Sequence, residues 1–197
     1  MIQELPLVLV SGIPQRTLVA MTSAASSPFT GGQQVQDWGG RYWFYQITMA
    51  RLRGRNALIM DAFLNGLGGL AGRFIFRDPA IEQTIAGTPL VAGGAQSGSS
   101  LITDGWPTSA TVMQTGEFFS LGAGSAMRLH QIAADVDSNA SGVATLTFHP
   151  PLRASPSDND ALNVANPGVL LRLTDQAPAR IGAVATYLFT LSAREAL

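Results

Sequence analysis

The chain has 197 residues and a formal net charge of −1; 13% of its residues are charged, 46% are hydrophobic and none is cysteine. An average soluble domain is about 25% charged, so this chain has a surface unusually poor in charge. These values exclude a disulfide framework and a thiolate metal site, and they argue against the basic surface typical of nucleic-acid-binding proteins.

The low charge has two explanations. Either uncharged polar residues cover much of the surface or neighbouring subunits do, and we expect the second. All twelve basic residues are arginine, which suits planar hydrogen-bonded contacts, although the base composition of a genome explains the same bias equally well. The apolar stretch Leu5–Val10 contains Pro6 and follows Glu4, so we expect neither a signal peptide nor a membrane span there.

The N-terminal region predicts two strands, Leu5–Val10 and Arg16–Thr22, because aliphatic and β-branched residues run between turn formers. Gly12 and Pro14 would join them as a hairpin. The following stretch, residues 23 to 34, is rich in small residues and has no apolar periodicity, so it predicts either a long loop or a projecting hairpin. We expect this stretch to become ordered only on assembly, because Phe29 is its one hydrophobic anchor.

Residues 41 to 49 predict a half-buried strand, because apolar side chains recur at every second position. The apolar face consists of Trp43, Tyr45, Ile47 and Met49. Beyond it come three arginines at alternate positions, which are Arg51, Arg53 and Arg55. Their guanidinium groups could contact carboxylates or carbonyls of another subunit, or they could simply be solvated at a strand end.

A helix is predicted from Arg55, because the spacing of apolar residues changes from two to about 3.6. Its buried side would consist of Ile59, Met60, Phe63, Leu64 and Leu67. The glycines between positions 66 and 69 would end the helix. Residues 73 to 79 then predict a short strand that ends before Pro79.

A change of composition over residues 80 to 98 marks a boundary. The short strands predicted after it, such as Glu117–Leu121, Ala126–Ala134 and Val143–Phe148, indicate a small antiparallel barrel or sandwich. Longer strands return in the C-terminal part, as Val169–Thr174 and one run from Arg180 to about Arg194. The apolar face of that run would comprise Ile181, Ala183, Ala185, Tyr187, Phe189 and Leu191.

The C-terminal strands need partners, and the N-terminal strands are the natural ones. The sequence therefore predicts a mainly β protein with a split β-sandwich or barrel, one flanking α-helix and an inserted small antiparallel β-barrel. The first domain would contain residues 1–80 and 161–197. The inserted, outward-facing domain would contain residues 81–160.

The sequence contains no strong metal-binding or catalytic motif. Asp135, Asp137 and Asn139 alternate as in a calcium loop, but Ala140 stands where such a loop needs glycine, so a polar hairpin turn is preferred. His130 and His149 have no third metal ligand or nucleophile at a useful spacing and are interpreted as structural.

A carboxylate pair for glycoside hydrolysis, Asp104 and Glu117, is not distinguished from the other acids by spacing. The glycine clusters at residues 66–72 and 93–98 do not match a phosphate-binding loop. We expect no enzyme activity, metal or cofactor.

Aromatic residues of the inserted domain could stack on sugars. Phe118 and Phe119 are adjacent and would point to opposite faces, so at least one of them should lie in a core. Trp106, which precedes Pro107 in a predicted loop, is the candidate for a glycan contact. It motivates an alternative function, a carbohydrate-binding module for attachment to a host surface.

The order of segments resembles the distal tail proteins of long-tailed, non-contractile bacteriophages and prophages. The resemblance covers almost the whole chain and is carried by SPFTGGQQVQDWGGRYWFYQITM, NALIMDAFLNGLGG, RFIFRDP, GEFFSLG, MRLHQIAADVDSNASGVATLTFHPPLR and LFTLSAREAL. It implies a tail-tube-like domain that forms a ring, generally of six copies, and an appended barrel that is oligosaccharide-binding-like in some members.

The resemblance also implies partners and a location. The ring would join the tail tube to the baseplate hub or tail fibre proteins, viral DNA would pass through its lumen without specific binding, and the protein would be assembled in the host cytoplasm into the tail tip of the virion. Residues 41 to 49 would lie in a sheet that joins subunits edge to edge. The expected subunit-interface residues are Trp43, Tyr45, Arg51, Arg53 and Arg55. Tube and terminator proteins of tails are close alternatives.

Overall fold

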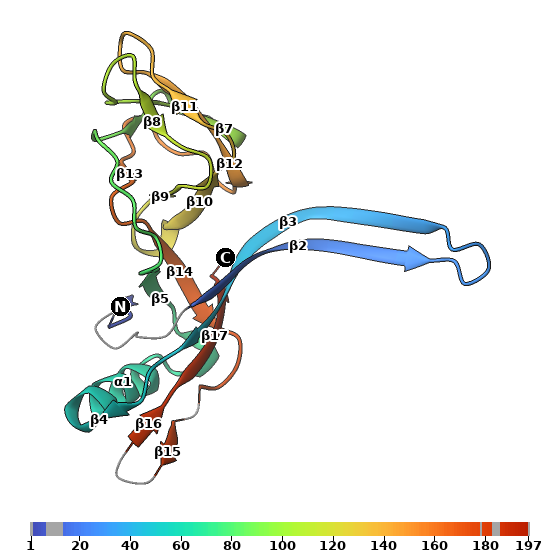
Figure 1. Cartoon of the computed structure of the whole chain (residues 1–197), viewed down its shortest axis with the longest axis vertical. Coiled ribbons are helices and arrows are strands. Elements are labelled where there is room, and N and C mark those ends of the chain that lie inside the picture. The colour runs from blue at the N-terminus through green and yellow to red at the C-terminus, as the bar shows by residue number, and fades with distance from the viewer. Residues whose placement is uncertain (1, 7–13, 178, 183–185, 197) are drawn as a thin grey trace.

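Two six-stranded sheets account for most of the strands in the computed structural model (Figure 1), which describes residues 2–6, 14–177, 179–182 and 186–196. Within these ranges the protein is mainly β and has one α-helix, as the sequence predicts. The first sheet has the strand order β1 (Gln3–Glu4), β5 (Phe74–Arg77), β14 (Gly168–Leu173), β17 (Thr190–Glu195), β3 (Gln33–Thr48) and β2 (Gln15–Ser26). Its N- and C-terminal strands pair with each other, because β17 lies between β14 and β3.

The second sheet curls into a nearly closed barrel. Its strand order is β13 (Leu162–Asn163), β9 (Phe118–Leu121), β10 (Arg128–Ile132), β12 (Ala144–Leu152), β7 (Gly98–Asp104) and β6 (Leu90–Val91). A bridge between Leu90 and Ala161 brings its first and last strands together, and the Val91 N–H donates to the Asp160 oxygen over 2.9 Å. All six strands come from residues 90 to 163, between the halves of the first sheet. The division into two domains stays a prediction, and β13 lies in the barrel sheet although the predicted boundary places residues 161–197 in the first domain.

Smaller elements complete the fold. The strands β8 (Thr111–Met113) and β11 (Val136–Asp137) pair at the far end of the barrel, and η3 (Gly124–Ala126) connects β9 to β10. A three-stranded sheet of β15 (Arg180–Gly182), β16 (Thr186–Leu188) and β4 (Leu52–Arg53) lies beside helix α1 (Gly54–Gly66), which is followed by η2 (Gly69–Ala71). No helix in the described ranges is long and apolar enough to cross a membrane.

Helix α1 begins one residue before the predicted start and packs through a slightly different face. Met60, Phe63 and Leu64 are buried as predicted, but Ile59 is 41% exposed and Ala57 is buried instead. The prediction for Ile59 is wrong because the buried stripe is centred on Met60 and extends towards Ala57 and Leu64, whereas Ile59 lies about 100° from Met60 on the other side. The helix ends at glycine, as predicted.

Strand β2 extends further than the predicted strand Arg16–Thr22, because it continues to Ser26. Strand β2 pairs with β3 along nearly its whole length, from Gln15 opposite Gln46 to Ser26 opposite Gln33. Most of the predicted strand Leu5–Val10 lies outside the described residues, which exclude 7 to 13. Of the two alternatives for residues 23 to 34, the projecting hairpin is confirmed: the strands continue to Ser26 and resume at Gln33.

The predicted C-terminal run from Arg180 to about Arg194 is not one strand. Arg180–Gly182 pairs antiparallel with Thr186–Leu188, so the chain reverses before β17 begins. Phe189 and Leu191 are buried as predicted, whereas Ile181 is 66% exposed, and Ala183 and Ala185 lie outside the described residues. Alternation alone could not show the reversal, because directly opposed residues of an antiparallel pair share a face.

Adjacent residues on β9 supply two separate cores. Phe118 belongs to the core between the first sheet and α1, whereas Phe119 belongs to the core inside the barrel. This follows from the period of two along a strand. Both rings are buried, so the prediction that at least one of them is a core residue is confirmed.

Candidate functional site

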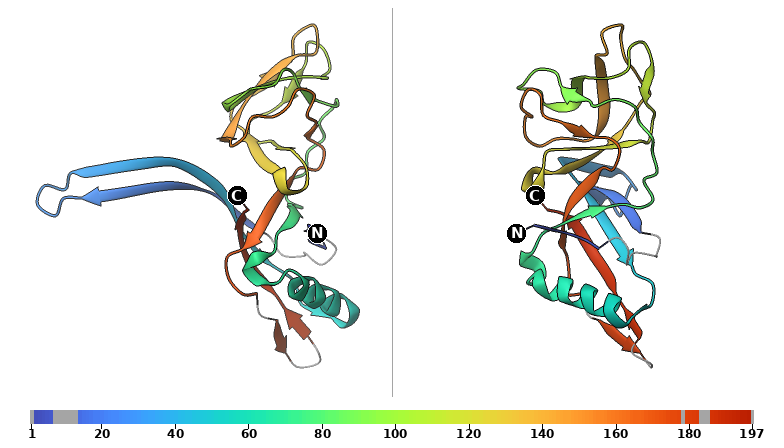
Figure 2. Two further views of the ribbon diagram at one scale, coloured as in Figure 1. Left: turned by 180° about the vertical axis from the view of Figure 1, so that it is seen from behind. Right: turned by 90° about the vertical axis from the view of Figure 1, so that its left-hand side faces the viewer.

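A long two-stranded arm is the feature of this molecule that a single copy does not explain. We define the arm as residues 20–40, the outer parts of β2 and β3 with the turn between them. Figure 1 shows it extending away from both sheets, and Figure 2 shows the same projection from behind. Its residues are exposed except for the half-buried Ser27 and Gly40, and Asp37 is the one charged residue in it.

The arm exposes large apolar side chains with nothing to pack against. Met21 is 53% exposed, Phe29 95%, Val35 62% and Trp38 70%. These are four of the nine exposed large hydrophobic residues among those the structure describes. An isolated two-stranded ribbon is marginal in water, and clustered exposed apolar side chains mark interaction surfaces. The arm therefore has the composition of a surface that another molecule covers.

Both edges of the arm are open. Strand β2 is the last strand of its sheet, and β17 pairs with β3 only between Phe44 and Thr48. In the described part of the chain, the outer N–H and C=O groups of both arm strands thus have no strand beside them. Long unpaired edges invite pairing with another chain.

The arm leaves the body at a well-fixed base. A β-bulge between Ala20 and Thr22 bends the ribbon, and on the opposite strand Gly39 has a φ of 73° and donates its N–H to Asp37 Oδ1 over 2.8 Å. Just below the bend, Arg16 donates to the carboxylate of the buried Asp78. The direction of the arm is therefore set by bonded residues at its root.

The aromatic residues predicted for the subunit interface lie inside the subunit. Trp43 is 3% exposed and its Nε1 donates to the Leu129 oxygen over 2.8 Å, while Tyr45 is fully buried with its ring 5.2 Å from that of Phe76. These contacts correct the expectation that Trp43 and Tyr45 meet another subunit. The inner part of β3 is also paired on both sides, so it has no free edge for another subunit, whereas β2 and the arm do within the described residues.

The three arginines beyond β3 are exposed, as an interface role requires. Arg51 and Arg53, together with Arg180 of β15, line a hollow of about 440 Å³, and Arg55 lies in the first turn of α1. None of these four forms an ion pair with a carboxylate in the described chain. Their guanidinium groups are available to carboxylates of another molecule.

A buried carboxylate lies where the two sheets meet. Glu195 of β17 is 1% exposed and accepts the Trp43 N–H over 3.4 Å. The guanidinium groups of Arg153 and Arg128 lie 3.8 and 4.0 Å from its oxygens. Burial raises the pKa of Glu195 above its ordinary value and outweighs the two arginines, which lower it. Removal from water is costly for a charge even beside cations.

The structure does not support Trp106 as a glycan contact. Its ring is 5% exposed in the barrel core, and its Nε1 donates to Thr103 Oγ1 over 2.8 Å. A buried ring has no free face for a sugar, so the role of Trp106 in this fold is packing.

His130 is a core residue, which fits its structural interpretation. Its Nδ1 bonds to the Pro150 oxygen over 2.8 Å, and its ring stacks on Phe119 and meets Phe148 edge to face. Burial lowers its pKa to about 4, so the ring is neutral near pH 7. His149 is exposed on β12.

The polar loop around residue 137 has local bonds. Asp135 accepts from the Thr115 N–H over 2.8 Å, and Asn139 accepts from the Ser141 N–H over 2.8 Å. These bonds fit the interpretation as a polar hairpin turn. In the described ranges no three residues of the types that bind metals lie close enough together to hold an ion.

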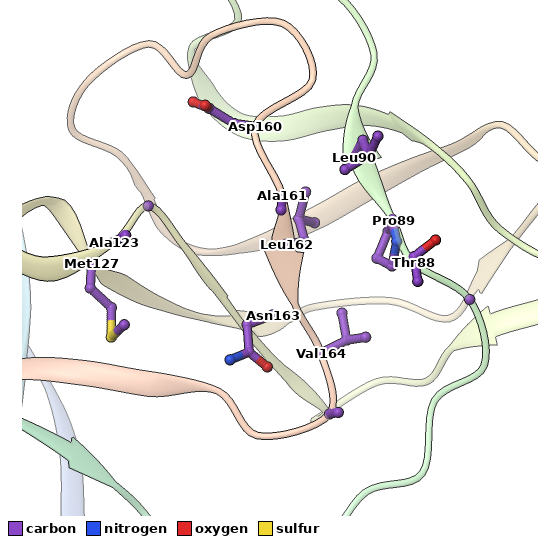
Figure 3. Close-up of a pocket in the computed structure, with 13 residues that line it drawn as sticks. Thr88, Pro89, Leu90, Ala123, Met127, Asp160, Ala161, Leu162, Asn163 and Val164 are labelled. Carbon is purple, nitrogen blue, oxygen red and sulfur yellow. The ribbon is translucent and has the colours of Figure 1, made fainter. Parts of the chain in front are cut away.

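A hollow of about 620 Å³ lies at the seam where β6 meets β13 (Figure 3). Its polar side chains are engaged locally: Asp160 accepts the Ser157 N–H over 2.7 Å and Asn163 accepts the Asn166 N–H over 3.0 Å. No histidine, arginine or second carboxylate is among its lining residues. The hollow thus lacks the paired groups of acid–base catalysis.

Glu117, one of the two acids considered as a glycosidase pair, accepts the Gln114 N–H in its own turn.

Sequence reasoning missed the contacts that fix the arm root and the junction between the sheets. Arg16 and Asp78 are 62 positions apart, and Glu195 and Trp43 are 152 apart. Neither pair forms a local pattern, so no motif could have predicted it. No protein-family model and no curated protein matches the sequence.

Proposed function

We propose that this protein is a structural ring component of a bacteriophage tail tip, of the distal tail protein kind, without enzyme activity. Copies of the chain, generally six, would form a ring between the tail tube and the baseplate hub or tail fibre proteins. Viral DNA would pass through the lumen. The proposal draws on the resemblance of the sequence and on the arm.

The arm is the observation that carries the proposal. It is an extended ribbon with four exposed large apolar residues, one charge and two open edges. The arm can be buried only against a surface that a second molecule provides. When that molecule is a second copy, the contact is heterologous, and repeated heterologous contacts close into a ring if the rotation between copies allows it. Ring closure would also cover the open edges of β2 and β3.

The proposal also assigns a role to each of the two predicted domains. Residues 1–80 and 161–197 would be the tube-like, ring-forming unit, a split β-sandwich or barrel from which the arm projects. Residues 81–160 would be the outward-facing unit, an oligosaccharide-binding-like barrel by fold. The arm and the barrel leave the first sheet in different directions (Figure 2), so both could be engaged at once.

Tube and terminator proteins are the nearest alternatives, since the fold does not separate them. The presence of a second barrel favours the distal position. A carbohydrate-binding module is disfavoured, because the residue that motivated it, Trp106, is buried.

The test is the mass of the purified chain in solution, measured by light scattering over a range of concentrations. We expect assemblies of a fixed number of 20.7 kDa subunits, six if the resemblance holds. A shortened variant, in which Asn-Gly replaces residues 23–36 and leaves the Thr22 and Asp37 pair, should be folded and monomeric. A wild-type chain that stays monomeric at high concentration would contradict the proposal.

A further inference from the structure

Helix α1 carries a second row of side chains that faces away from its core. The row consists of Arg55, Leu58, Ile59 and Ala62, which follow the helical spacing of three and four residues and are all exposed. Leu58 is 60% exposed and Ile59 is 41% exposed. A helix that is apolar on both faces is normally covered on both. We call these four residues the outer row of α1.

The arm has two faces of different character. Directly opposed residues of an antiparallel pair point to the same side. Ala24 lies opposite Val35, and Thr22 lies opposite Asp37. These four residues form one side of the arm, which we call the Val35 face. The neighbouring residue Gln36 points to the other side, because side chains alternate along a strand.

The Val35 face and the outer row of α1 are complementary. Each combines a branched apolar group with a charge, and the charges are opposite: Asp37 on the arm and Arg55 on the helix. Asp37 Oδ2 also lies 3.7 Å from Arg41 Nη2 of its own chain, but the side chain is half exposed in this pair, so it can accept a second guanidinium from a neighbour. Val35 and Asp37 are two residues apart on a strand, a distance of about 7 Å. Arg55 and Leu58 are neighbours on a helix surface, about 5 to 6 Å apart. An apolar contact and an ion pair could therefore form together.

We propose that the Val35 face of the arm in one copy docks onto the outer row of α1 in the next copy. An arm cannot reach the helix of its own chain, because it projects to the other side of the body (Figures 1 and 2). The contact is heterologous and so suits a ring. This inference depends on the proposed function, and it adds which surface of the neighbour receives the arm.

Cysteine pairs test the docking directly, because the chain has no native cysteine. The double variant Val35→Cys with Ile59→Cys should form disulfides between copies on mild oxidation. On a denaturing gel these give a ladder of covalent multimers. The matched control is Gln36→Cys with Ile59→Cys, which moves the first thiol by one residue to the other face. Because a disulfide needs Cβ atoms about 3.5 to 4.5 Å apart, we expect at least a tenfold lower yield from the control.

The result separates this inference from the proposed function. If both double variants assemble by light scattering but crosslink equally, or not at all, the docking surface is wrong and the ring proposal stands. If neither they nor the wild-type chain assembles, the ring proposal fails as well.

A second measurement does not depend on disulfide geometry. Asp37→Asn, which keeps the oxygen that accepts the Gly39 N–H, and Arg55→Gln should each weaken assembly several-fold. The double variant should be no weaker than either single variant, because the two charges act as one pair. Independent, additive losses would overturn the pairing.

Discussion

The indole N–H of Trp43 on β3 donates to the backbone oxygen of Leu129 on β10 over 2.8 Å, and so joins the first sheet to the barrel. The Trp43 ring also lies 5.9 Å from that of Phe118, and its backbone N–H donates to Glu195. One residue of the strand that continues into the arm thus contacts both sheets. The root of the arm is built on this buried junction.

The hydrogen bond of Trp43 can be tested by Trp43→Phe. The variant keeps an aromatic ring but leaves the buried Leu129 oxygen without its donor, which should lower the free energy of unfolding by about 1–3 kcal/mol. At concentrations where single copies prevail, Trp38→Phe is the matched control, because Trp38 is 70% exposed in one copy and should change stability by less than about 0.5 kcal/mol. Urea unfolding measures both. Equal, small effects would show that the junction bond contributes nothing.

The buried imidazole of His130 predicts a loss of stability in mild acid. Its pKa is about 4 in the folded chain and 6.5 in the unfolded chain, because burial disfavours the charged ring. Between these values the unfolded chain binds the proton and the folded chain does not. Stability is therefore complete above pH 6.5 and falls as the pH drops towards 4, by about 2–3 kcal/mol.

His130→Phe removes this titration. We expect the variant to be less stable than wild type at pH 7.5, because the bond to Pro150 is lost, and the difference to shrink at pH 4.5. Chemical unfolding at the two pH values measures it. A difference that does not change with pH would contradict a neutral, buried His130.

Glu195 predicts a pH dependence of stability opposite to that of His130. Its pKa is raised by burial, so between its ordinary value of 4.5 and its folded value the folded chain binds the proton and the unfolded chain does not. The contribution of Glu195 to stability therefore becomes less favourable as the pH rises through this window. Glu195→Gln should be at least as stable as wild type at pH 8 and should lose that advantage below pH 4.5. A variant that is much less stable at pH 8 would show that the pairs with Arg128 and Arg153 dominate.

Trp106 should affect stability and leave sugar binding unchanged. Trp106→Ala removes a buried ring from the barrel core and should cost about 3–5 kcal/mol of unfolding free energy. Trp106→Phe keeps most of the packing but loses the bond to Thr103, so it should cost less. Thermal unfolding of both variants measures this. A folded Trp106→Phe chain that loses affinity for host glycans would restore the glycan interpretation.

The sequence predicts which side chains are buried better than it predicts whether the same chain or another subunit buries them. Alternation from Trp43 to Met49 correctly indicated a buried strand face, because that pattern depends only on the period of two. The same pattern arises whether a face packs on its own core or on a neighbour, so it cannot show that Trp43 and Tyr45 pack inside their own chain rather than at an interface. Trp106 was misassigned for the same reason, since its loop sequence did not reveal that the ring turns inward.

Two other errors have local causes. Ile59 was placed in the core because α1 is apolar on two sides, and periodicity cannot choose between them. The reversal between Arg180–Gly182 and Thr186–Leu188 was missed because a hairpin preserves the alternation of a single strand. The arm itself was foreseen only as one of two alternatives, since its strands are built from small polar residues with weak strand signals.

The central claim is that the arm is completed by another copy, and hydrogen–deuterium exchange of its amides tests this most directly. Exchange in residues 20–40 should be fast at low concentration, where single copies prevail, because an isolated two-stranded ribbon opens easily. It should slow markedly once assemblies form, because docking on a neighbour holds the ribbon closed. Amides of β10 in the barrel core serve as the reference and should exchange at the same rate in both states. Arm amides that exchange equally fast in monomer and assembly would contradict the claim.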